Sequence, residues 1–381
     1  MLNKVFSIVF VVILGLMYFL NPSRFNINLI LNNTLLFGML YVSVLYYLLQ
    51  ESINSRLSFQ LKRYMISLYD LRYFFIIYFV INLIFSSRYI NFYSASYFNE
   101  FTTDWFSTNF YYARQFIYLA LIIGSLYYIK LKQVPEVYFN YLLLFLLSFL
   151  FILFSYDLLA FVQDVTIQEF WQSTIWTFYL FINLLTCLFA IIIIIQLFSK
   201  AENTSDFIKN ISSQLFGFNI FWSYLFFCQL VIIYYANIPS ESYLYNIRFM
   251  PPWILYQGLV IFLHLIIPAI FLFTKRGRSS RQSLLIASYS TIMAVALDLM
   301  CYFIPTYSQF GITIFEYTFF IFSFVIFMIL FMHKYLSYKK AQIIMNDNNL
   351  QQTNSLNSID NSNSLNEIES DNESRKSDEE N

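Results

Sequence analysis

Hydrophobic residues in this chain gather in long runs that are separated by short polar stretches. Runs of about 20 residues match about 30 Å of bilayer hydrocarbon at about 1.5 Å of helix rise per residue. They lack the alternation of apolar and polar residues that a transmembrane β-barrel strand needs. The pattern predicts an all-α, polytopic membrane bundle of about ten transmembrane helices, at residues 5–20, 29–49, 73–86, 111–129, 138–162, 174–198, 215–235, 253–274, 283–304 and 314–333.

The two ends of the chain differ from the region between them. Residues 341–381 are rich in Asn, Ser and acidic residues with almost nothing to bury, which is typical of disorder. We therefore expect an integral membrane helical domain over 1–340 and a disordered tail over 341–381. Lys4 and the apolar run that follows it resemble a secretory signal, but no small-x-small cleavage site comes after them. We interpret this run as an uncleaved first helix.

The overall composition agrees with a membrane protein. The chain is 59% hydrophobic and only 12% charged, whereas about a quarter of the residues in a typical soluble domain are charged. Its formal net charge is +0, without the basic excess that is typical of nucleic-acid binding. We expect membrane lipid, and no nucleic acid, among its partners.

The distribution of Lys and Arg predicts the orientation of the bundle. Numbering the predicted loops alternately places 16 of these residues on the side of the N-terminus and three, Arg24, Arg88 and Arg248, on the opposite side. Lys and Arg concentrate in cytoplasmic loops. We therefore predict that both termini and the tail are cytoplasmic, and that the stretch Gln229–Arg248 faces outward.

Polar and ionisable residues recur in the outer half of the predicted bundle. Each ionisable group at such a depth costs at least about 2.5–3.5 kcal/mol unless it is paired or solvated, so each is a candidate functional residue. The alternative is that an arginine and an acid neutralise each other and only hold helices together. The candidates are Arg114, Asp157, Gln229, Asn237, Glu241, Arg248 and Asp298.

Metal and nucleophile chemistry find little support in the sequence. Cys187, Cys228 and Cys301 are isolated within predicted spans, without the C-x₂-C spacing of zinc or iron–sulfur sites. His264 and His333 differ by about 15 Å in expected depth, which disfavours a haem held by two histidines. No metal site is predicted, and no nucleotide-binding or hydrolase motif is present. His264 is either a packing residue or part of a proton relay.

Four stretches resemble, in order, a family of respiratory membrane subunits. The most specific is "FWSYLFFCQLVIIYYANIPSESYLYNIR" (Phe221–Arg248), and the others are Asn28–Gln50 with the "LKRY" loop after it, Ser155–Phe181 and Ala296–Pro305. They resemble quinone-binding-type membrane subunit 2, the F subunit, of the quinol:cytochrome c oxidoreductase known as alternative complex III. That subunit is related to the membrane subunits of polysulfide reductase. The matching positions are Trp222, Tyr224, Cys228, Gln229, Tyr234, Asn237, Pro239, Glu241 and Arg248, with Asp157, Trp171, Ser173, Thr174, Asp298 and Pro305.

The chain also departs from that family's pattern. Ser240 replaces one of two paired glutamates, and Phe170 replaces a histidine. The residues Asn210–Ser212 replace an Asp-Leu-Gly. Each departure removes a titratable group, so the proton route of the family does not carry over intact.

The resemblance implies a multi-pass subunit in the bacterial inner (cytoplasmic) membrane that supports quinol oxidation, proton transfer and assembly. No cofactor would be bound covalently, and quinone or quinol is the candidate ligand. Haem c and iron–sulfur clusters would belong to partners: an iron–sulfur/molybdopterin-like subunit, c-type cytochrome subunits and a second homologous membrane subunit. The proton-relay candidates are Asp157, Glu241, Asp298, Arg114, Arg248, Asn237, Gln229 and His264.

Two other functions stay open from the sequence. Ten helices with polar groups near the midplane would also suit a secondary transporter, although no two spans are broken by Gly or Pro at corresponding positions. A membrane receptor or scaffold with the acidic tail as its docking segment is the third hypothesis.

Overall fold

The structure, a computed structural model, describes residues 22–93, 107–131, 137–159, 173, 175–199, 205–305, 317–318 and 321–340. Every regular element in these ranges is a helix, which confirms the all-α prediction for them. The predicted first span, 5–20, and the predicted tail, 341–381, lie outside the described residues.

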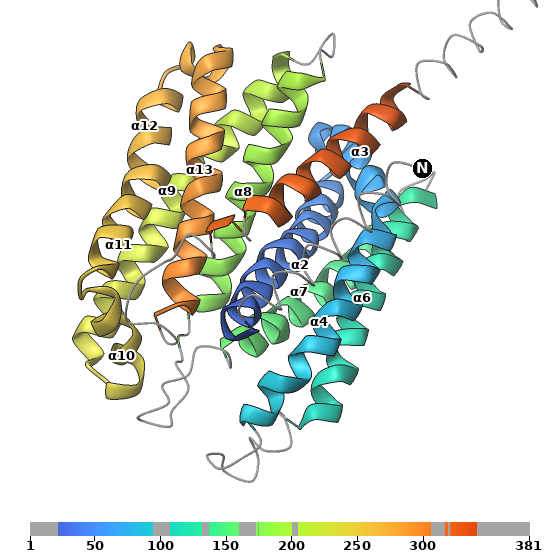
Figure 1. Cartoon of the computed structure of the whole chain (residues 1–381). Helices are drawn as coiled ribbons and strands as arrows, with labels where there is room; N and C mark the ends of the chain where they lie inside the picture. Colours follow the sequence, from blue (N-terminus) through green and yellow to red (C-terminus); the bar gives the residue numbers. More distant parts are fainter. Residues whose placement is uncertain are drawn as a thin grey trace, which may run out of the picture. The chain divides into compact units, whose positions relative to one another are not determined.

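The first half of the described chain forms one group of helices, which pack around α2 (Figure 1). Helix α2 ends at Ser52. Ser55 then caps the amphipathic helix α3 by accepting a hydrogen bond from the Leu57 N–H. The members of this group are α2 (Pro22–Ser52), α3 (Arg56–Asp70), α4 (Arg72–Tyr93), α6 (Thr108–Leu131) and α7 (Val137–Leu159).

The second half forms another group, in which α8 and α13 pack on each other and on α9, α11 and α12. Contacts of α2 with α8 and of α7 with α8 join the two groups, as Figure 1 shows. The members are α8 (Trp176–Phe198), α9 (Ser205–Ala236), α10 (Pro239–Arg248), α11 (Trp253–Ile261), the π-turn η1 (Phe262–Ile266), α12 (Ile267–Leu272), the 3₁₀ turn η2 (Gly277–Ser279) and α13 (Arg281–Phe303).

Seven helices within the described residues are long and apolar enough to cross a membrane: Asn28–Ser52, Tyr138–Leu158, Trp176–Phe198, Asp206–Ala236, Trp253–Leu272, Arg281–Phe303 and Ile321–Lys340. The pair Arg56–Asp70 and Arg72–Ile84, bent by 53°, would make an eighth span. The predicted span 111–129 coincides with α6, which is not among the seven. The count of ten and the cytoplasmic termini stay predictions.

The basic stretch between the second and third predicted spans is a helix instead of a loop. It forms α3, whose apolar side chains, Leu57, Leu61, Tyr64 and Leu68, are buried. Lys62 and Arg63 remain half-buried near the surface. This helix was not predicted because its apolar residues follow the spacing of an amphipathic helix, which a search for long apolar runs overlooks. Helix α9 likewise begins at Ser205, about ten residues before the predicted span.

Helices α2 and α8 approach closely at Gly38. A Cβ atom at position 38 would lie 2.5 Å from Cδ1 of Leu184, far inside van der Waals contact. We expect Gly38→Val to displace Leu184 and to lower the free energy of unfolding by about 1–3 kcal/mol. The matched control is Gly124→Val on α6, where a Cβ atom meets nothing within 4 Å and which should cost under about 1 kcal/mol. Unfolding in a denaturing-detergent titration measures both, and equal losses would contradict the close packing.

Candidate functional site

A buried ion pair joins the end of α10 to the middle of the second helix group. The Nη2 atom of Arg248 lies 3.5 Å from Oδ1 of Asp298, and their side chains are 1% and 0% exposed. Arg248 is the last residue of α10, and Asp298 lies in the final third of α13. Two charges at this depth are tolerated because each compensates the other and because further groups hydrogen-bond to both.

The Asp298 carboxylate is held from the opposite side by α8. Tyr179 donates its hydroxyl proton to Oδ2 of Asp298 at 2.6 Å, and Asn183 donates from Nδ2 to the same oxygen at 2.8 Å. Tyr179 and Asn183 are four residues apart, so α8 presents both on one face. The aspartate therefore has two neutral donors as well as the arginine.

The guanidinium of Arg248 is held by α11 and α13. Its Nε and Nη2 donate to Oε1 of Gln257 at 2.9 and 2.5 Å. Its Cζ lies 3.8 Å from the centroid of the Tyr302 ring, a cation–π contact. These contacts fix the orientation of the guanidinium toward Asp298.

A line of hydrogen bonds continues from Tyr302 away from the ion pair. The Tyr302 hydroxyl donates to Oε1 of Gln229 at 3.0 Å, and Nε2 of Gln229 donates to Oγ of Ser173 at 2.9 Å. The Tyr245 hydroxyl, on α10, lies 3.4 Å from that of Tyr302. Since the Tyr302 hydroxyl proton is used toward Gln229, Tyr245 donates to Tyr302. Burial raises the pKa of Tyr245 well above its ordinary value. We call these residues the Arg248 cluster: Tyr179, Asn183, Gln229, Tyr245, Arg248, Gln257, Asp298 and Tyr302.

A second buried ion pair lies in the first helix group. Arg114 of α6 donates from Nη2 to Oδ1 of Asp157 of α7 at 2.8 Å and from Nε to Oδ2 at 3.3 Å. Tyr118 donates its hydroxyl proton to Oδ2 at 3.1 Å, and Gln115 donates to it at 3.4 Å. Arg114 and Asp157 are 5% and 2% exposed.

The two pairs are built alike. In each, the arginine lies near the start of a span or just before it, and the aspartate lies near the end of the next span. Each aspartate accepts from a tyrosine hydroxyl, and each pair has a glutamine beside it. The sequence predicted one constellation, whereas the structure divides its charged residues between two ion pairs in different helix groups.

Trp176 lies between the two pairs. Its indole nitrogen donates to the Ser155 carbonyl at 3.0 Å, two residues before Asp157. Its ring lies 4.8 Å from that of Tyr302 in the Arg248 cluster. An aromatic ring contact does not conduct protons. The contacts of Trp176 therefore link the two pairs by packing, without joining their hydrogen bonds.

Two predicted site residues lie away from the cluster, where α9 ends and α10 begins. Asn237 is exposed and has a φ of 47°, a left-handed conformation that Asn adopts more readily than most residues. It ends α9, where its N–H donates to the Ile233 carbonyl at 3.0 Å. Glu241 is half-buried in the first turn of α10, where a negative charge favours the helix dipole. Neither side chain is among the partners of Arg248 and Asp298 described above.

His264 lies in the π-turn η1 and is fully buried. Its ring stacks on Trp222 with centroids 3.9 Å apart and 5° between the planes. Nε2 lies 3.3 Å from the Thr186 hydroxyl, which itself donates to the Asn183 carbonyl at 2.7 Å. Since that hydroxyl proton is already used, the imidazole donates from Nε2. His264 therefore contacts its surroundings mainly through ring packing. One hydrogen bond, to Thr186, links it to α8, the helix that carries Asn183.

The stacking gives a prediction for His264. We expect His264→Phe to change the free energy of unfolding by less than about 1.5 kcal/mol, because a ring of similar shape keeps the contact with Trp222. His264→Ala should cost about 2–4 kcal/mol through the cavity it leaves. Unfolding in a denaturing-detergent titration distinguishes the two, and a loss with Phe as large as that with Ala would contradict a mainly packing role.

Several buried polar atoms at this site have no hydrogen-bond partner within the described ranges. They include Asn183 Oδ1, Arg248 Nη1 and Gln257 Nε2 of the Arg248 cluster, and His264 Nδ1 beside it. An unsatisfied buried polar atom costs about 1–3 kcal/mol, and buried water usually satisfies it. The described groups of the protein thus leave several donors and acceptors in this region for buried water.

Five members of the cluster were not predicted from the sequence: Tyr179, Asn183, Tyr245, Gln257 and Tyr302. All five are uncharged, so a search for charged residues within the spans passed over them. The i, i+4 spacing of Tyr179 and Asn183 in an otherwise apolar run was the available signal, because it places both polar groups on one helix face.

The described residues contain no group of three or more His, Cys, Asp and Glu side chains placed to hold a metal ion. Cys187 and Cys301 are buried and Cys228 is half-buried, each as a free thiol. They behave as small apolar side chains.

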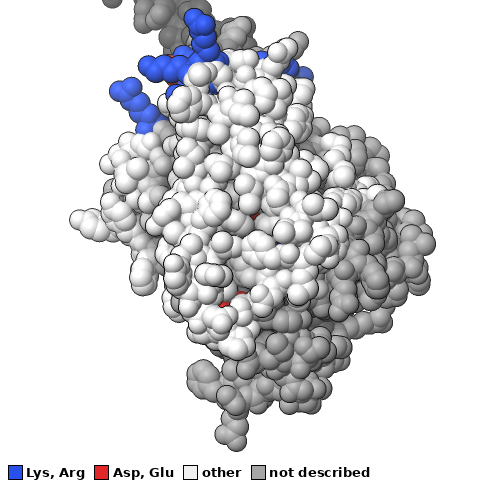
Figure 2. Space-filling model, turned by 90° about the vertical axis from the view of Figure 1, so that its left-hand side faces the viewer, with Lys and Arg blue, Asp and Glu red and all other residues white. Residues whose placement is uncertain are grey.

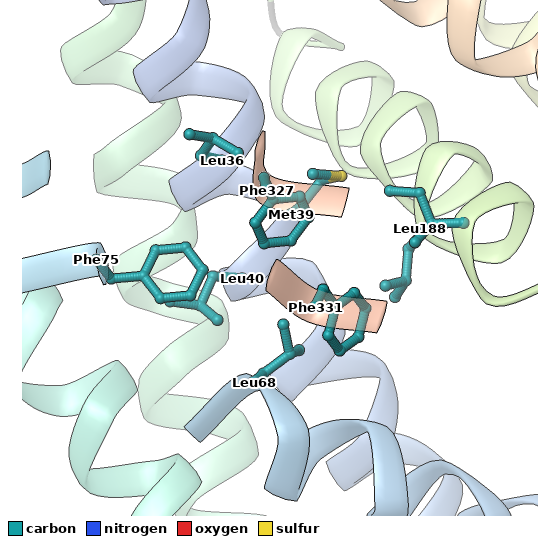
Figure 3. Close-up of a pocket in the computed structure, with 9 residues that line it drawn as sticks. Leu36, Met39, Leu40, Leu68, Phe75, Leu188, Phe327 and Phe331 are labelled. Atoms are coloured by element: carbon teal, nitrogen blue, oxygen red, sulfur yellow. The ribbon is translucent and has the colours of Figure 1, made fainter. Parts of the chain in front are cut away.

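An apolar hollow lies between α2, α3, α4, α8 and the helix that begins at Ile321, as Figure 3 shows. Its free space is about 10 Å³, room for about one water-sized molecule. That is far too small for a quinone ring. The hollow is lined by Leu36, Met39, Leu40, Leu68, Phe75, Leu188, Phe327, Phe331 and Ile191.

The described residues thus form an all-helical chain with the long apolar helices of a multi-pass membrane protein and with buried Arg–Asp pairs in both helix groups. No model of a known protein family matches the chain, and no curated protein matches it either.

Proposed function

We propose that this chain is an integral membrane subunit of a quinol:cytochrome c oxidoreductase of the alternative complex III type. One observation carries the proposal. Three of the stretches that resemble this family meet in one cluster, joined by hydrogen bonds, an ion pair and a cation–π contact: Ser155–Phe181 contributes Tyr179, Phe221–Arg248 contributes Gln229 and Arg248, and Ala296–Pro305 contributes Asp298 and Tyr302. If the resemblance were a coincidence of single positions, these three stretches would not be expected to meet at one site in the fold.

The chemistry of the cluster suits proton transfer beside a quinol-oxidising site. Quinol oxidation releases two protons, and a carboxylate can accept one of them. Asp298 lies within hydrogen-bond distance of the Tyr179 hydroxyl, and Arg248 orients the carboxylate and favours its charged form. The Tyr302 ring contacts the Arg248 guanidinium, and its hydroxyl lies 3.4 Å from that of Tyr245 on α10. Under the proposed orientation, α10 is on the outer side of the membrane, where such protons leave.

The surface near α10 supports its position at a membrane boundary. Tyr234 and Tyr235 at the end of α9 are 79% and 82% exposed, and tyrosine is enriched where a bilayer meets water. Lys275 and Arg276, which are also exposed, lie in the turn between α12 and α13, one transmembrane span away from α10. Figure 2 shows Lys and Arg gathered at one end of the visible face. This separation supports the predicted orientation, in which the termini are cytoplasmic.

The partners follow from the same proposal. This chain would bind an iron–sulfur/molybdopterin-like subunit, c-type cytochrome subunits and a second homologous membrane subunit, which hold the haem c and the iron–sulfur clusters. Quinone or quinol would be the ligand at the membrane subunits.

Purification of the full chain tests this assignment. An affinity-tagged chain, extracted in mild detergent from its native membrane, should bring with it c-type haem that is reduced on addition of a quinol. The reduced-minus-oxidised spectrum reports the haem. A chain that elutes without haem-bearing partners, from membranes that retain quinol:cytochrome c activity, would contradict the proposal.

A secondary transporter is the second candidate, favoured by two interrupted spans. The α3–α4 pair bends by 53°, and the span from Trp253 to Leu272 contains the π-turn η1. One interruption lies in each helix group, and transporters build midplane sites from such discontinuous helices. Solute uptake by proteoliposomes that contain only this chain would favour transport over the respiratory complex.

A further inference from the structure

The turn between α12 and α13 carries a dense group of cations. Lys275, Arg276, Arg278 and Arg281 fall within seven residues, in the 3₁₀ turn η2 and on either side of it. Lys275, Arg276 and Arg281 are exposed, and Arg278 is half-buried. We call these four residues the basic turn. It lies at the end of the spans Trp253–Leu272 and Arg281–Phe303, where a helix leaves the hydrocarbon.

Acidic residues do little to neutralise the basic turn. Between Ser205 and Pro305 the chain has only three acids, Asp206, Glu241 and Asp298. Asp206 pairs with Lys209 at 3.4 Å, and Asp298 is buried beside Arg248. Within the described ranges, no salt bridge includes a residue of the basic turn. Within the described residues, the positive charge of the basic turn is therefore left for another anion.

The start of α13 adds to this positive field. Ser280 is its N-cap, but its side chain makes no capping hydrogen bond, and the first turn contains no acid. The first residue of the helix is Arg281 instead. A helix N-terminus carries a partial positive charge that an anion stabilises and a cation does not. The N-terminus of α13 and the four cations of the basic turn thus both favour an anionic ligand.

Apolar side chains beside the basic turn indicate where that ligand comes from. Phe273 and Ile270, in the residues just before the cations, are 72% and 66% exposed. The guanidinium of Arg281 lies 5.7 Å from the ring centroid of Phe198, at the end of α8. Exposed apolar groups next to cations match the boundary between acyl chains and headgroups of a bilayer.

We propose that the basic turn binds the phosphate of an anionic phospholipid headgroup, with Phe273 and Ile270 against its acyl chains. Figure 2 shows Lys and Arg side chains gathered at one end of the visible face. The proposal is independent of the proposed function, since it concerns a surface that neither ion pair reaches. It assigns to this turn a lipid-selective contact that holds the ends of α12 and α13 at the headgroup level.

The test uses the full-length protein in nanodiscs of phosphatidylcholine with a minor fraction of phosphatidylglycerol. Native mass spectrometry counts the phosphatidylglycerol that stays bound after release from the disc. A basic residue near an anionic surface contributes about fivefold in binding, so Arg276→Gln with Arg278→Gln should lower retention by more than about fivefold. The matched control is Lys209→Gln, an exposed cation that is already paired with Asp206, and it should leave retention unchanged.

Three results would overturn the proposal. They are unchanged retention in the double variant, an equal loss in the Lys209→Gln control, and displacement of the lipid by millimolar inorganic phosphate, which would assign the turn to free phosphate. If the double variant does not fold, the effect of ionic strength on lipid binding by the wild-type protein tests the proposal instead. Raising the ionic strength should then release phosphatidylglycerol while phosphatidylcholine stays bound, and equal release of both would contradict a headgroup site.

Discussion

Replacing Asp298 by Ala is expected to lower the free energy of unfolding by about 3–5 kcal/mol, because Arg248 would stay buried without its counter-charge. Tyr179 and Asn183 would also lose their common acceptor. Few single changes in this chain should cost as much. The free energy is measured by unfolding the purified protein in a denaturing-detergent titration.

A double-mutant cycle separates the pair from its surroundings. Replacing Arg248 by Met should cost a similar amount, whereas the combination of Asp298→Ala with Arg248→Met should lose clearly less than the two single changes together, by about 2 kcal/mol. The matched control is Asp70→Ala, which removes an exposed partner of Lys130 and should cost under about 1 kcal/mol. Additive losses in the cycle would show that the charges of Arg248 and Asp298 are not coupled.

Replacing Asp298 by Asn should lower quinol:acceptor turnover in the native complex by about 10²-fold or more. Asn keeps the size of the side chain but cannot take up a proton, and general acid–base groups typically contribute about 10²–10⁴-fold. Proton release per electron should fall together with the rate. The measurement is quinol-driven acceptor reduction, with a pH-sensitive dye outside sealed vesicles.

The second ion pair supplies the control for this experiment. Asp157→Asn makes the same chemical change in a buried Arg–Asp pair that lies in the other helix group. We expect it to reduce stability but to leave turnover within about threefold, because the contacts described above do not join the hydrogen bonds of this pair to those of the Arg248 cluster. Unchanged turnover and proton release in Asp298→Asn would assign the Arg248 cluster to packing.

The helical spans were predictable because burial in hydrocarbon demands long apolar helices. Seven of the ten predicted spans coincide with long apolar helices of the described residues. Shorter amphipathic elements were missed: α3 buries one face and α10 is only ten residues long, so neither has a run of apolar residues that marks a span.

The site was predictable only in its charged residues. Arg248 and Asp298 stood out because a charge within a span is costly, but the sequence did not say which aspartate would pair with which arginine. That choice depends on which helices are neighbours: α6 with α7 brings Arg114 to Asp157, and the packing of α13 against α8 and α11 brings Arg248 to Asp298. The neutral partners, such as Gln257, become visible only once this packing is known.

The orientation of α10 is the claim on which the proposed proton exit depends. Asn237 is exposed just before α10, so a cysteine placed there should react with a membrane-impermeant maleimide. Lys275→Cys, in the basic turn, is the control for the other side, and the unmodified chain controls for its three native thiols. We expect Asn237→Cys to be labelled in intact cells and Lys275→Cys only after the membrane is opened. Labelling of Asn237→Cys only in opened membranes would place α10 in the cytoplasm and contradict the proposed proton exit.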